Sequence, residues 1–236
     1  MISVENLSVR IGAFALDDIT FQVPSGQCAV VMGKTGSGKT TILEAVCGLL
    51  PVVGGTIRLM DRNVTKSKPA ERGIGYVPQD GALFSTMPIR DQLAFALVIR
   101  KWSRKDIDHR VDEMADLLGI RHLLDRKPQG LSGGESQRIA LGRALAFKPG
   151  ILCMDEPLSA LDDETREDMY TLIESVREHT HVTCLHITHN LSEAKRLADQ
   201  LYMLRDGDIQ LVTFDRKTMT GDAESDASPN DAARAG

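Results

Sequence analysis

The strongest chemical signal in the sequence is a glycine-rich segment that ends in lysine and threonine. Residues 33–40 fit the phosphate-loop pattern of glycine, four residues, then Gly-Lys-Thr. Glycines let the backbone N–H groups converge on phosphate oxygens, and a following helix adds its positive N-terminal end. Lys39 then supplies charge for the β- and γ-phosphates, and Thr40 a hydroxyl for Mg²⁺. The predicted nucleotide-binding residues of this segment are Gly33, Lys34, Thr35, Gly36, Ser37, Gly38, Lys39, Thr40 and Thr41.

A second signal is the acidic pair Asp155 and Glu156, which follows the apolar run 151–154. The carboxyl end of a buried strand is where ligands bind in an open α/β sheet. We expect Asp155 to hold Mg²⁺ and Glu156 to orient or deprotonate an attacking water. Two acids at a strand end are also typical of a solvated edge, so the catalytic interpretation depends on the phosphate loop.

A third segment, residues 131–138, reads Leu-Ser-Gly-Gly-Glu-Ser-Gln-Arg and precedes a predicted helix. Ser132 and Glu135 have the spacing of a capping box, which is a sufficient structural explanation. Gly133 and Gly134 also leave bare N–H groups at a helix N-terminus, which suits a second anion. Two phosphate sites separated by a helical stretch indicate two chains arranged head to tail, each completing the other's pocket.

The elements that must position these residues begin with strands. Residues 2–9 and 18–23 alternate apolar and polar side chains, as half-buried antiparallel strands do. Residues 28–32 are continuously apolar, as in a strand covered on both faces. The helix predicted after the phosphate loop carries Gly48 at a position that suits its C-cap.

The rest of the chain predicts a helical insertion followed by alternating strands and helices. The helical pattern runs from about 89 to 147, and we place an inserted helical subdomain at about 85–147. Beyond it, the predicted strands are 151–154, 182–188, 201–204 and 209–212, and the predicted helices are 164–178 and 191–198. The fold class is therefore α/β, with a mixed sheet, an antiparallel β subdomain and the helical insertion.

Composition and charge argue against several classes of function. There are 33 acidic and 28 basic residues, so the net charge of −5 argues against a nucleic-acid partner. The longest apolar run, 93–99, is far below the ~20 residues of a membrane span, and the N-terminus does not resemble a secretory signal. The cysteines at 28, 47, 153 and 184 are predicted to be buried and reduced, without metal-ligand spacing. Residues 215–236 contain almost no large apolar side chains and are predicted to be disordered, leaving a domain at 1–214.

Taken together, these motifs resemble the ATP-binding-cassette (ABC) family, whose signature is Leu-Ser-Gly-Gly-Gln or a close variant. Here the signature is Leu131, Ser132, Gly133, Gly134 and Glu135, with glutamate in the place of glutamine. The resemblance implies that Gln79 is the Q-loop residue, which touches Mg²⁺ and the attacking water, and that His189 contacts the γ-phosphate. It also implies a D-loop at a dimer interface, formed by Ser159, Ala160, Leu161 and Asp162.

The resemblance further implies an ATP hydrolase of the ABC-type P-loop fold that uses ATP and Mg²⁺. The implied catalytic residues are Glu156, His189 and Gln79, and the implied Mg²⁺ ligands are Thr40, Gln79 and Asp155. The family stacks adenine on an aromatic residue about 28 positions before the loop lysine. Counting back from Lys39 gives Ile11, an aliphatic residue, with Phe14 nearby but out of register.

Among ABC proteins, a transporter ATPase is favoured over a protein acting on DNA or ribosomes. Ser132 lies only 53 positions after Gln79, too few for the long coiled coil of DNA-repair relatives, and one cassette is present where ribosome-acting relatives have two. Residues 73–84 resemble importers of molybdate, tungstate, sulfate, iron and polyamines, so we expect an importer, with an oxyanion as the favoured cargo; an exporter is the alternative.

The expected partners are a second copy of the chain, transmembrane permease subunits and a substrate-binding protein, at the cytoplasmic face of the inner membrane. We expect Phe84 to line a groove that receives a short permease helix. The alternative is that Leu83 and Phe84 pack inside the helical subdomain.

Overall fold

The computed structural model describes residues 1–212, so the tail predicted to be disordered lies outside the described residues. The strands are β1 (Ile2–Ile11), β2 (Phe14–Val23), β3 (Cys28–Met32), β4 (Gly54–Leu59), β5 (Arg62–Asn63), β6 (Ile74–Val77), β7 (Ile151–Asp155), β8 (Thr183–Thr188), β9 (Gln200–Arg205) and β10 (Asp208–Val212). The helices are α1 (Lys39–Cys47), α2 (Ile89–Ile99), α3 (Arg104–Leu117), α4 (Gly133–Leu145), α5 (Asp163–Thr180) and α6 (Leu191–Leu197). Two single turns, Pro69–Glu71 and Arg121–Leu123, complete the set.

The strands form two sheets, as the α/β prediction requires. The larger is six-stranded, in the order β10-β9-β3-β8-β7-β6, and its neighbours are parallel except for β9 and β10. The smaller is an antiparallel four-stranded sheet in the order β2-β1-β4-β5. Because β3, β8, β7 and β6 are parallel neighbours, the segments that follow them meet at one edge of the larger sheet.

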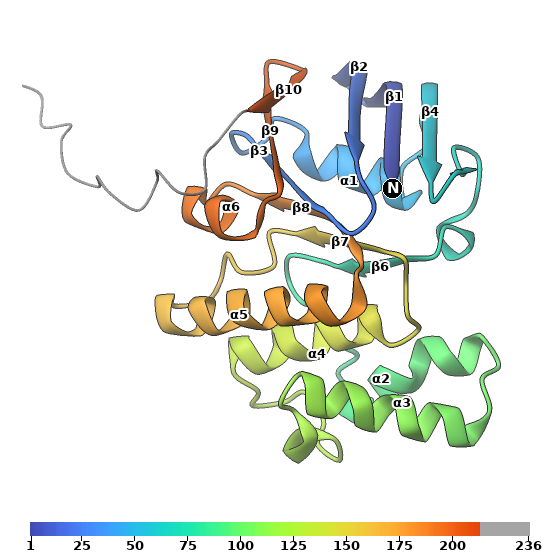
Figure 1. Cartoon of the computed structure of the whole chain (residues 1–236), viewed down its shortest axis with the longest axis vertical. Coiled ribbons are helices and arrows are strands. Elements are labelled where there is room, and N and C mark those ends of the chain that lie inside the picture. Colours follow the sequence, from blue (N-terminus) through green and yellow to red (C-terminus); the bar gives the residue numbers. More distant parts are fainter. Residues whose placement is uncertain (213–236) are drawn as a thin grey trace, which may run out of the picture.

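The larger sheet lies between two hydrophobic cores. On one side, α1 packs between the two sheets, while α4, α5 and α6 cover the opposite face and α2 and α3 lie beyond them (Figure 1). Alternate residues of β3 serve the two cores: Ala29 and Val31 face α1, whereas Cys28 and Val30 face the other helices. This double covering explains why 28–32 is apolar throughout.

Some elements agree with the sequence pattern and others do not. Gly48 caps α1 with a positive φ of 79°, as predicted. The strands β4, β5 and β6 have no counterpart among the predicted elements. Gly54 and Gly55 in β4 and Gly75 in β6 interrupt the apolar pattern on which strand prediction relies.

The helix α4 joins the helical region to the larger sheet. A Cβ on Gly75 would lie 2.5 Å from the carbonyl oxygen of Ala144, so glycine permits close packing of α4 on β6. On its other side, a Cβ on Gly142 would lie 2.4 Å from Leu118 Cδ1. Within residues 1–212, no helix has the length and apolar character that crossing a membrane requires.

Candidate active site

The phosphate loop connects β3 to α1 at the carboxyl edge of the larger sheet. Its turn places Gly36 and Gly38 at φ values of 79° and 103°, which side chains other than glycine rarely tolerate. A Cβ on Gly38 would also lie 2.8 Å from Phe14 Cζ and 2.9 Å from Leu16 Cδ1. Gly38 is therefore required by its backbone conformation, and a side chain there would also have to displace the ends of Phe14 and Leu16.

The loop lysine is held inside the loop. Lys39 is 5% exposed, and its ammonium group donates to the carbonyl oxygens of Gly33 at 3.0 Å and Lys34 at 3.1 Å. The same Nζ lies 3.6 Å from Glu156 Oε1. A buried ammonium group attracts phosphate oxygens, which would compete with Glu156 for its charge.

The end of β7 lies beside the first turn of α1. Thr40 Oγ1 donates to Asp155 Oδ1 at 3.1 Å, and Asp155 is 5% exposed. Burial raises the pKa of Asp155. The hydrogen bond from Thr40 lowers this pKa and the like charge of Glu156 raises it, so that the pKa is raised on balance. A cation bound nearby would stabilise the charged form of the Asp155 carboxylate and would also be attracted by the Thr40 hydroxyl oxygen.

Glu156 is set in an unusual backbone conformation. Its φ of 42° lies in the left-handed region, a strained geometry for a residue with a side chain. The surrounding structure fixes it: Glu156 N donates to the carbonyl of Ile187 at 3.0 Å, and Ser159 Oγ donates to the carbonyl of Glu156 at 2.9 Å. The side chain meets His189 Nδ1 at 2.7 Å through Oε2. Glu156 is therefore held between Lys39 and His189.

Gln79 follows β6, so it lies at the same edge of the sheet one strand beyond Asp155. Its side chain is exposed, and its main-chain carbonyl accepts a hydrogen bond from Gln137 Nε2 at 3.4 Å. The structure thus brings Lys39, Asp155, Glu156 and His189 together, with Gln79 at the margin of the group.

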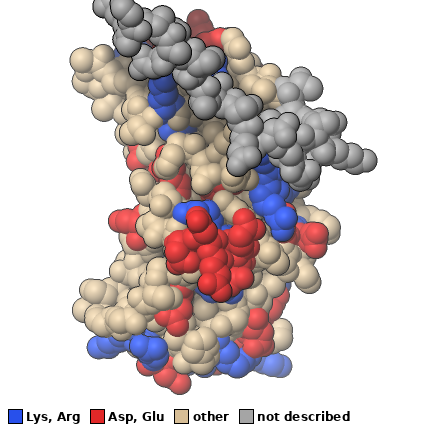
Figure 2. Space-filling model, turned by 90° about the vertical axis from the view of Figure 1, so that its left-hand side faces the viewer, with Lys and Arg blue, Asp and Glu red and all other residues tan. Residues whose placement is uncertain are grey.

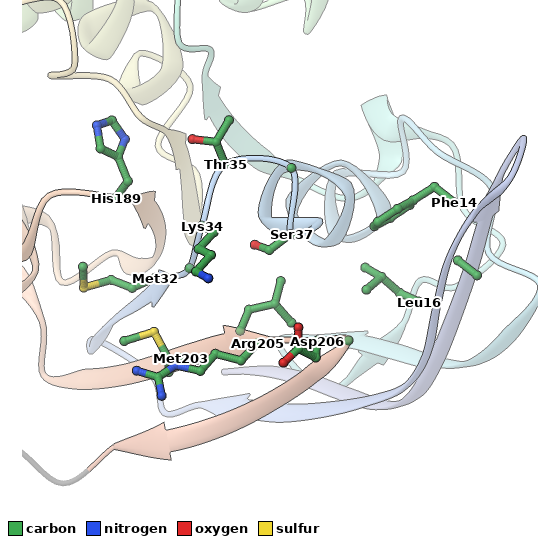
Figure 3. A pocket seen from close by; sticks show the side chains of 15 residues that line it. Phe14, Leu16, Met32, Lys34, Thr35, Ser37, His189, Met203, Arg205 and Asp206 are labelled. Atoms are coloured by element: carbon green, nitrogen blue, oxygen red, sulfur yellow. The ribbon is translucent and has the colours of Figure 1, made fainter.

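A cavity of about 1010 Å³ opens beside the phosphate loop. It lies between the loop, the start of β2 and the turn after β9, and His189 borders it (Figure 3). The residues of β2 that line it are Phe14, Ala15 and Leu16. Ile11 is not part of this lining and is 43% exposed, so its contact with the base stays a prediction. The hairpin turn pairs Ile11 with Phe14 and leaves Phe14 facing the loop.

The opposite wall of the cavity has no counterpart in the sequence prediction. Met203, Leu204, Arg205, Asp206 and Gly207 contribute to it from the end of β9 and the turn into β10 (Figure 3). They reach the loop because β9 pairs with β3, and the carbonyl oxygen of Leu204 would lie 2.6 Å from a Cβ on Gly33. This wall arises from strand order, which local sequence does not reveal.

The segment 131–135 is at the N-terminus of α4, away from this cavity. Ser132 caps the helix: Glu135 N donates to Ser132 Oγ at 3.1 Å, and Ser132 N donates to Glu135 Oε2 at 2.7 Å, which confirms the capping box. Gly134 packs closely on α5, since a Cβ there would lie 2.6 Å from Thr165 Cγ2. The residues lining the cavity include none of Leu131, Ser132, Gly133, Gly134 or Glu135.

The segment 159–162 leads from Glu156 to α5. Ser159 and Ala160 are exposed, Leu161 is buried, and Asp162 caps α5 by accepting from Thr165 N at 3.0 Å. Figure 2 shows a patch of acidic side chains on the face that carries this end of α5. The exposed acids there are Asp162, Asp163, Glu164, Glu167 and Asp168. Acids in the first turn complement the positive end of the helix.

The fold and the loop define a nucleotide-binding α/β protein, and comparison with known proteins places it more closely. The family model described as "ABC transporter" matches residues 16–159. The chain therefore belongs to the ABC transporter family.

Two solved structures share the fold. A nucleotide-free ATP-binding cassette from an ABC transporter is 25% identical, with a TM-score of 0.78 over 89% of each chain. A dimeric cassette in a post-hydrolysis state bound to ADP and phosphate is 24% identical, with a TM-score of 0.78 over 89% of this chain and 97% of its own.

Curated relatives match over most of this chain. The molybdate/tungstate import ATP-binding protein WtpC of Thermococcus kodakarensis is 39% identical over 212 residues, covering 90% of this chain. The sulfate/thiosulfate import ATP-binding protein CysA of Nocardia farcinica is 41% identical over 213 residues, also covering 90%. The match spans 64% of the length of each of these relatives.

Proposed function

We propose that the chain is the ATP-binding and ATP-hydrolysing subunit of an ABC importer. The observation that carries this is the convergence of Lys39, Glu156 and His189, with Glu156 Oε2 2.7 Å from His189 Nδ1 and Oε1 3.6 Å from Lys39 Nζ. A phosphate-binding cation, a carboxylate base and a histidine at one sheet edge suit phosphoryl transfer to water. The test is Mg²⁺-dependent phosphate release from ATP by the purified chain.

In this mechanism, the loop binds the phosphates and the strand ends activate water. Backbone N–H groups of 36–40 and the Lys39 ammonium hold the β- and γ-phosphates. Glu156 orients the water and accepts its proton, and His189, hydrogen-bonded to the same carboxylate, fixes its orientation and contacts the γ-phosphate. The reaction ends when ADP and phosphate are released from the site.

The oxygen atoms near Asp155 fit Mg²⁺. Thr40 Oγ1 and Asp155 Oδ1 lie 3.1 Å apart, and an oxygen-only donor set with few protein ligands is what Mg²⁺ prefers beside substrate phosphates. Thr40, Asp155 and Gln79 would hold the ion. When bound, Mg²⁺ neutralises charge that develops on the phosphate oxygens.

Two chains would form each complete site, arranged head to tail. The signature residues are at a helix N-terminus outside the cavity of their own chain, so their N–H groups suit the phosphate of a second copy. The D-loop, 159–162, exposes Ser159 and Ala160 next to Glu156, which suits the same interface. We also propose the domain boundaries predicted from the sequence, an ATPase domain at 1–214 with a helical subdomain at about 85–147 inserted in it.

The remaining partners follow from the importer assignment. Transmembrane permease subunits would carry the cargo, a substrate-binding protein would deliver it, and this chain would work at the cytoplasmic face of the membrane. The names of the relatives favour an oxyanion such as molybdate, tungstate or sulfate.

An apolar surface beside the Q-loop suits permease docking. Phe84 is 42% exposed and Phe95 39%, with ring centroids 5.1 Å apart, and the Arg143 guanidinium lies 5.2 Å from the Phe84 ring centroid. By contrast, Leu93 and Leu97 of the same helix are fully buried. This division supports Phe84 as a docking residue and Leu93 as a core residue, and a helix of the permease is the occupant that the surface suits.

Replacing Phe84 by alanine is expected to abolish co-purification with the permease and leave the melting temperature of the chain close to that of the wild type. Leu93→Ala is the matched control, because removing a buried leucine costs about 2–5 kcal/mol. Thermal unfolding and permease pull-down of the two variants separate the roles. Destabilised Phe84→Ala protein that still assembles at normal yield would contradict the docking proposal.

Replacing Phe14 by leucine is expected to weaken ATP binding by about 2- to 12-fold, which corresponds to the loss of about 0.5–1.5 kcal/mol of aromatic stacking. Phe14 lines the cavity beside the phosphate loop, whereas Ile11 does not. Ile11→Ala is therefore expected to bind ATP as the wild type does. Titration of the three proteins with a fluorescent ATP analogue checks this, and weaker binding by Ile11→Ala alone would favour Ile11 over Phe14 as the base contact.

A further inference from the structure

A buried polar network lies directly behind His189. Successive same-face residues of β8, His186 and Thr188, point toward the side covered by α6. His186 is fully buried, Thr188 is 1% exposed and Glu193 of α6 is 2% exposed. Polar side chains this deeply buried need partners, because an unpaired one costs about 1–3 kcal/mol.

Glu193 connects the strand to the segment that follows it. Its Oε1 lies 2.7 Å from His186 Nε2, and its Oε2 accepts from Thr188 Oγ1 at 2.6 Å. Thr188 Oγ1 in turn accepts from the backbone N–H of Asn190 at 3.0 Å. The Glu193 carboxylate is thus joined through one hydroxyl to the backbone on the far side of His189.

Hydrogen bonds of Asn190 also fix the C-terminal end of the segment 188–190. Asn190 Oδ1 accepts from the backbone N–H groups of Ser192 at 2.8 Å and Glu193 at 3.2 Å, and so caps α6. The residues on both sides of His189 are therefore fixed to one another and to α6. Few backbone conformations of 188–190 satisfy all these bonds together.

Stability alone is a weak reason for such a network. Burial by itself lowers the pKa of His186, but the carboxylate of Glu193 outweighs burial, so the pKa of His186 is raised. Buried ion pairs often contribute no more stability than apolar residues of the same volume. Positioning of His189 is the better explanation for the network. The side chain of His189 is 55% exposed, so it depends on its backbone to meet Glu156.

We propose that Glu193 is a positioning residue for ATP hydrolysis, which acts through the Thr188 hydroxyl to hold 188–190 so that His189 faces Glu156. This inference rests on the proposed ATPase function. It concerns the hydrolytic step and not nucleotide binding, because the phosphate loop takes no part in the network.

The test compares two substitutions at Thr188. Thr188→Val keeps the side-chain shape and removes the hydroxyl, whereas Thr188→Ser keeps the hydroxyl and removes the methyl group. Thr188→Val is expected to lower kcat for ATP by about 10- to 100-fold, the scale of a small misplacement of a reacting group. Its KM and its affinity for a non-hydrolysable ATP analogue should stay within about twofold of wild type, and Thr188→Ser should retain most of kcat.

A merely structural role would give a different pattern. Wild-type kcat in folded Thr188→Val, or an equal loss of kcat in both variants, would overturn the inference, as would a loss confined to KM. If Thr188→Val does not fold, Glu193→Gln replaces it, since the amide keeps the volume and loses the charge, with the same kcat and KM criteria. A wild-type chain without ATPase activity would instead refute the proposed function itself.

Discussion

Glu156→Gln is expected to bind ATP normally and to hydrolyse it about 10²- to 10⁴-fold more slowly than the wild type, the range that a general base contributes. The amide keeps the volume of the carboxylate and can still bond His189, which lies 2.7 Å from Oε2. It cannot accept the proton of the attacking water. The measurement is steady-state phosphate release at saturating Mg²⁺ and ATP, together with nucleotide affinity.

The matched control is the same chemical change at Glu135. Glutamine there can still reach back to the backbone N–H of Ser132 in the capping box, so the helix start is preserved. Glu135→Gln is expected to keep a rate near that of the wild type. Full activity in Glu156→Gln would remove Glu156 from the mechanism, whatever the control shows.

Lys39→Ala and Ser132→Arg are each expected to abolish hydrolysis, and their mixture to recover part of it. Loss of Lys39 leaves the phosphate charge uncompensated, and arginine at 132 blocks the N-terminus of α4. In a mixed dimer one site carries both defects and the other carries neither. With random pairing of equal amounts, about a quarter of all sites are intact, because a head-to-tail pair takes one residue from each chain.

Lys34→Ala is the control for this experiment. Lys34 is in the same loop but has an exposed side chain, and it is its carbonyl oxygen that binds Lys39. Lys34→Ala should therefore remain active alone and need no complementation. Two inactive variants that recover no activity on mixing would indicate that each chain builds its own site.

Much of the site could be predicted from the sequence because its chemistry is carried by short contiguous segments. The loop 33–40 follows an apolar strand and the pair Asp155–Glu156 stands at the end of another, so the strand ends determine where both lie. Parallel pairing of β3, β8 and β7 then brings them together with His189. The capping box at Ser132 and the C-cap at Gly48 could be predicted for the same reason, because each depends only on residues that are close in sequence.

Other features depend on turns and on packing between elements, which sequence patterns do not reveal. Counting along the chain selected Ile11, but the β1–β2 turn determines that Phe14 faces the loop. The strand β6 was missed because Gly75 serves the close packing of α4 and weakens the apolar pattern. The wall formed by 203–207 needs the pairing of β9 with β3, and the bond from Thr188 to Glu193 needs the connection that leads from β8 into α6.

The most direct test of the account is the association state of Glu156→Gln with and without Mg²⁺ and ATP, measured by sedimentation velocity. If two chains enclose the nucleotide between the loop of one and the signature of the other, slow hydrolysis should trap them together. We expect a single species of the chain's own mass without nucleotide, and a species of twice that mass when Mg²⁺ and ATP are added. A Glu156→Gln chain that binds ATP and stays at the mass of one chain would contradict the shared site.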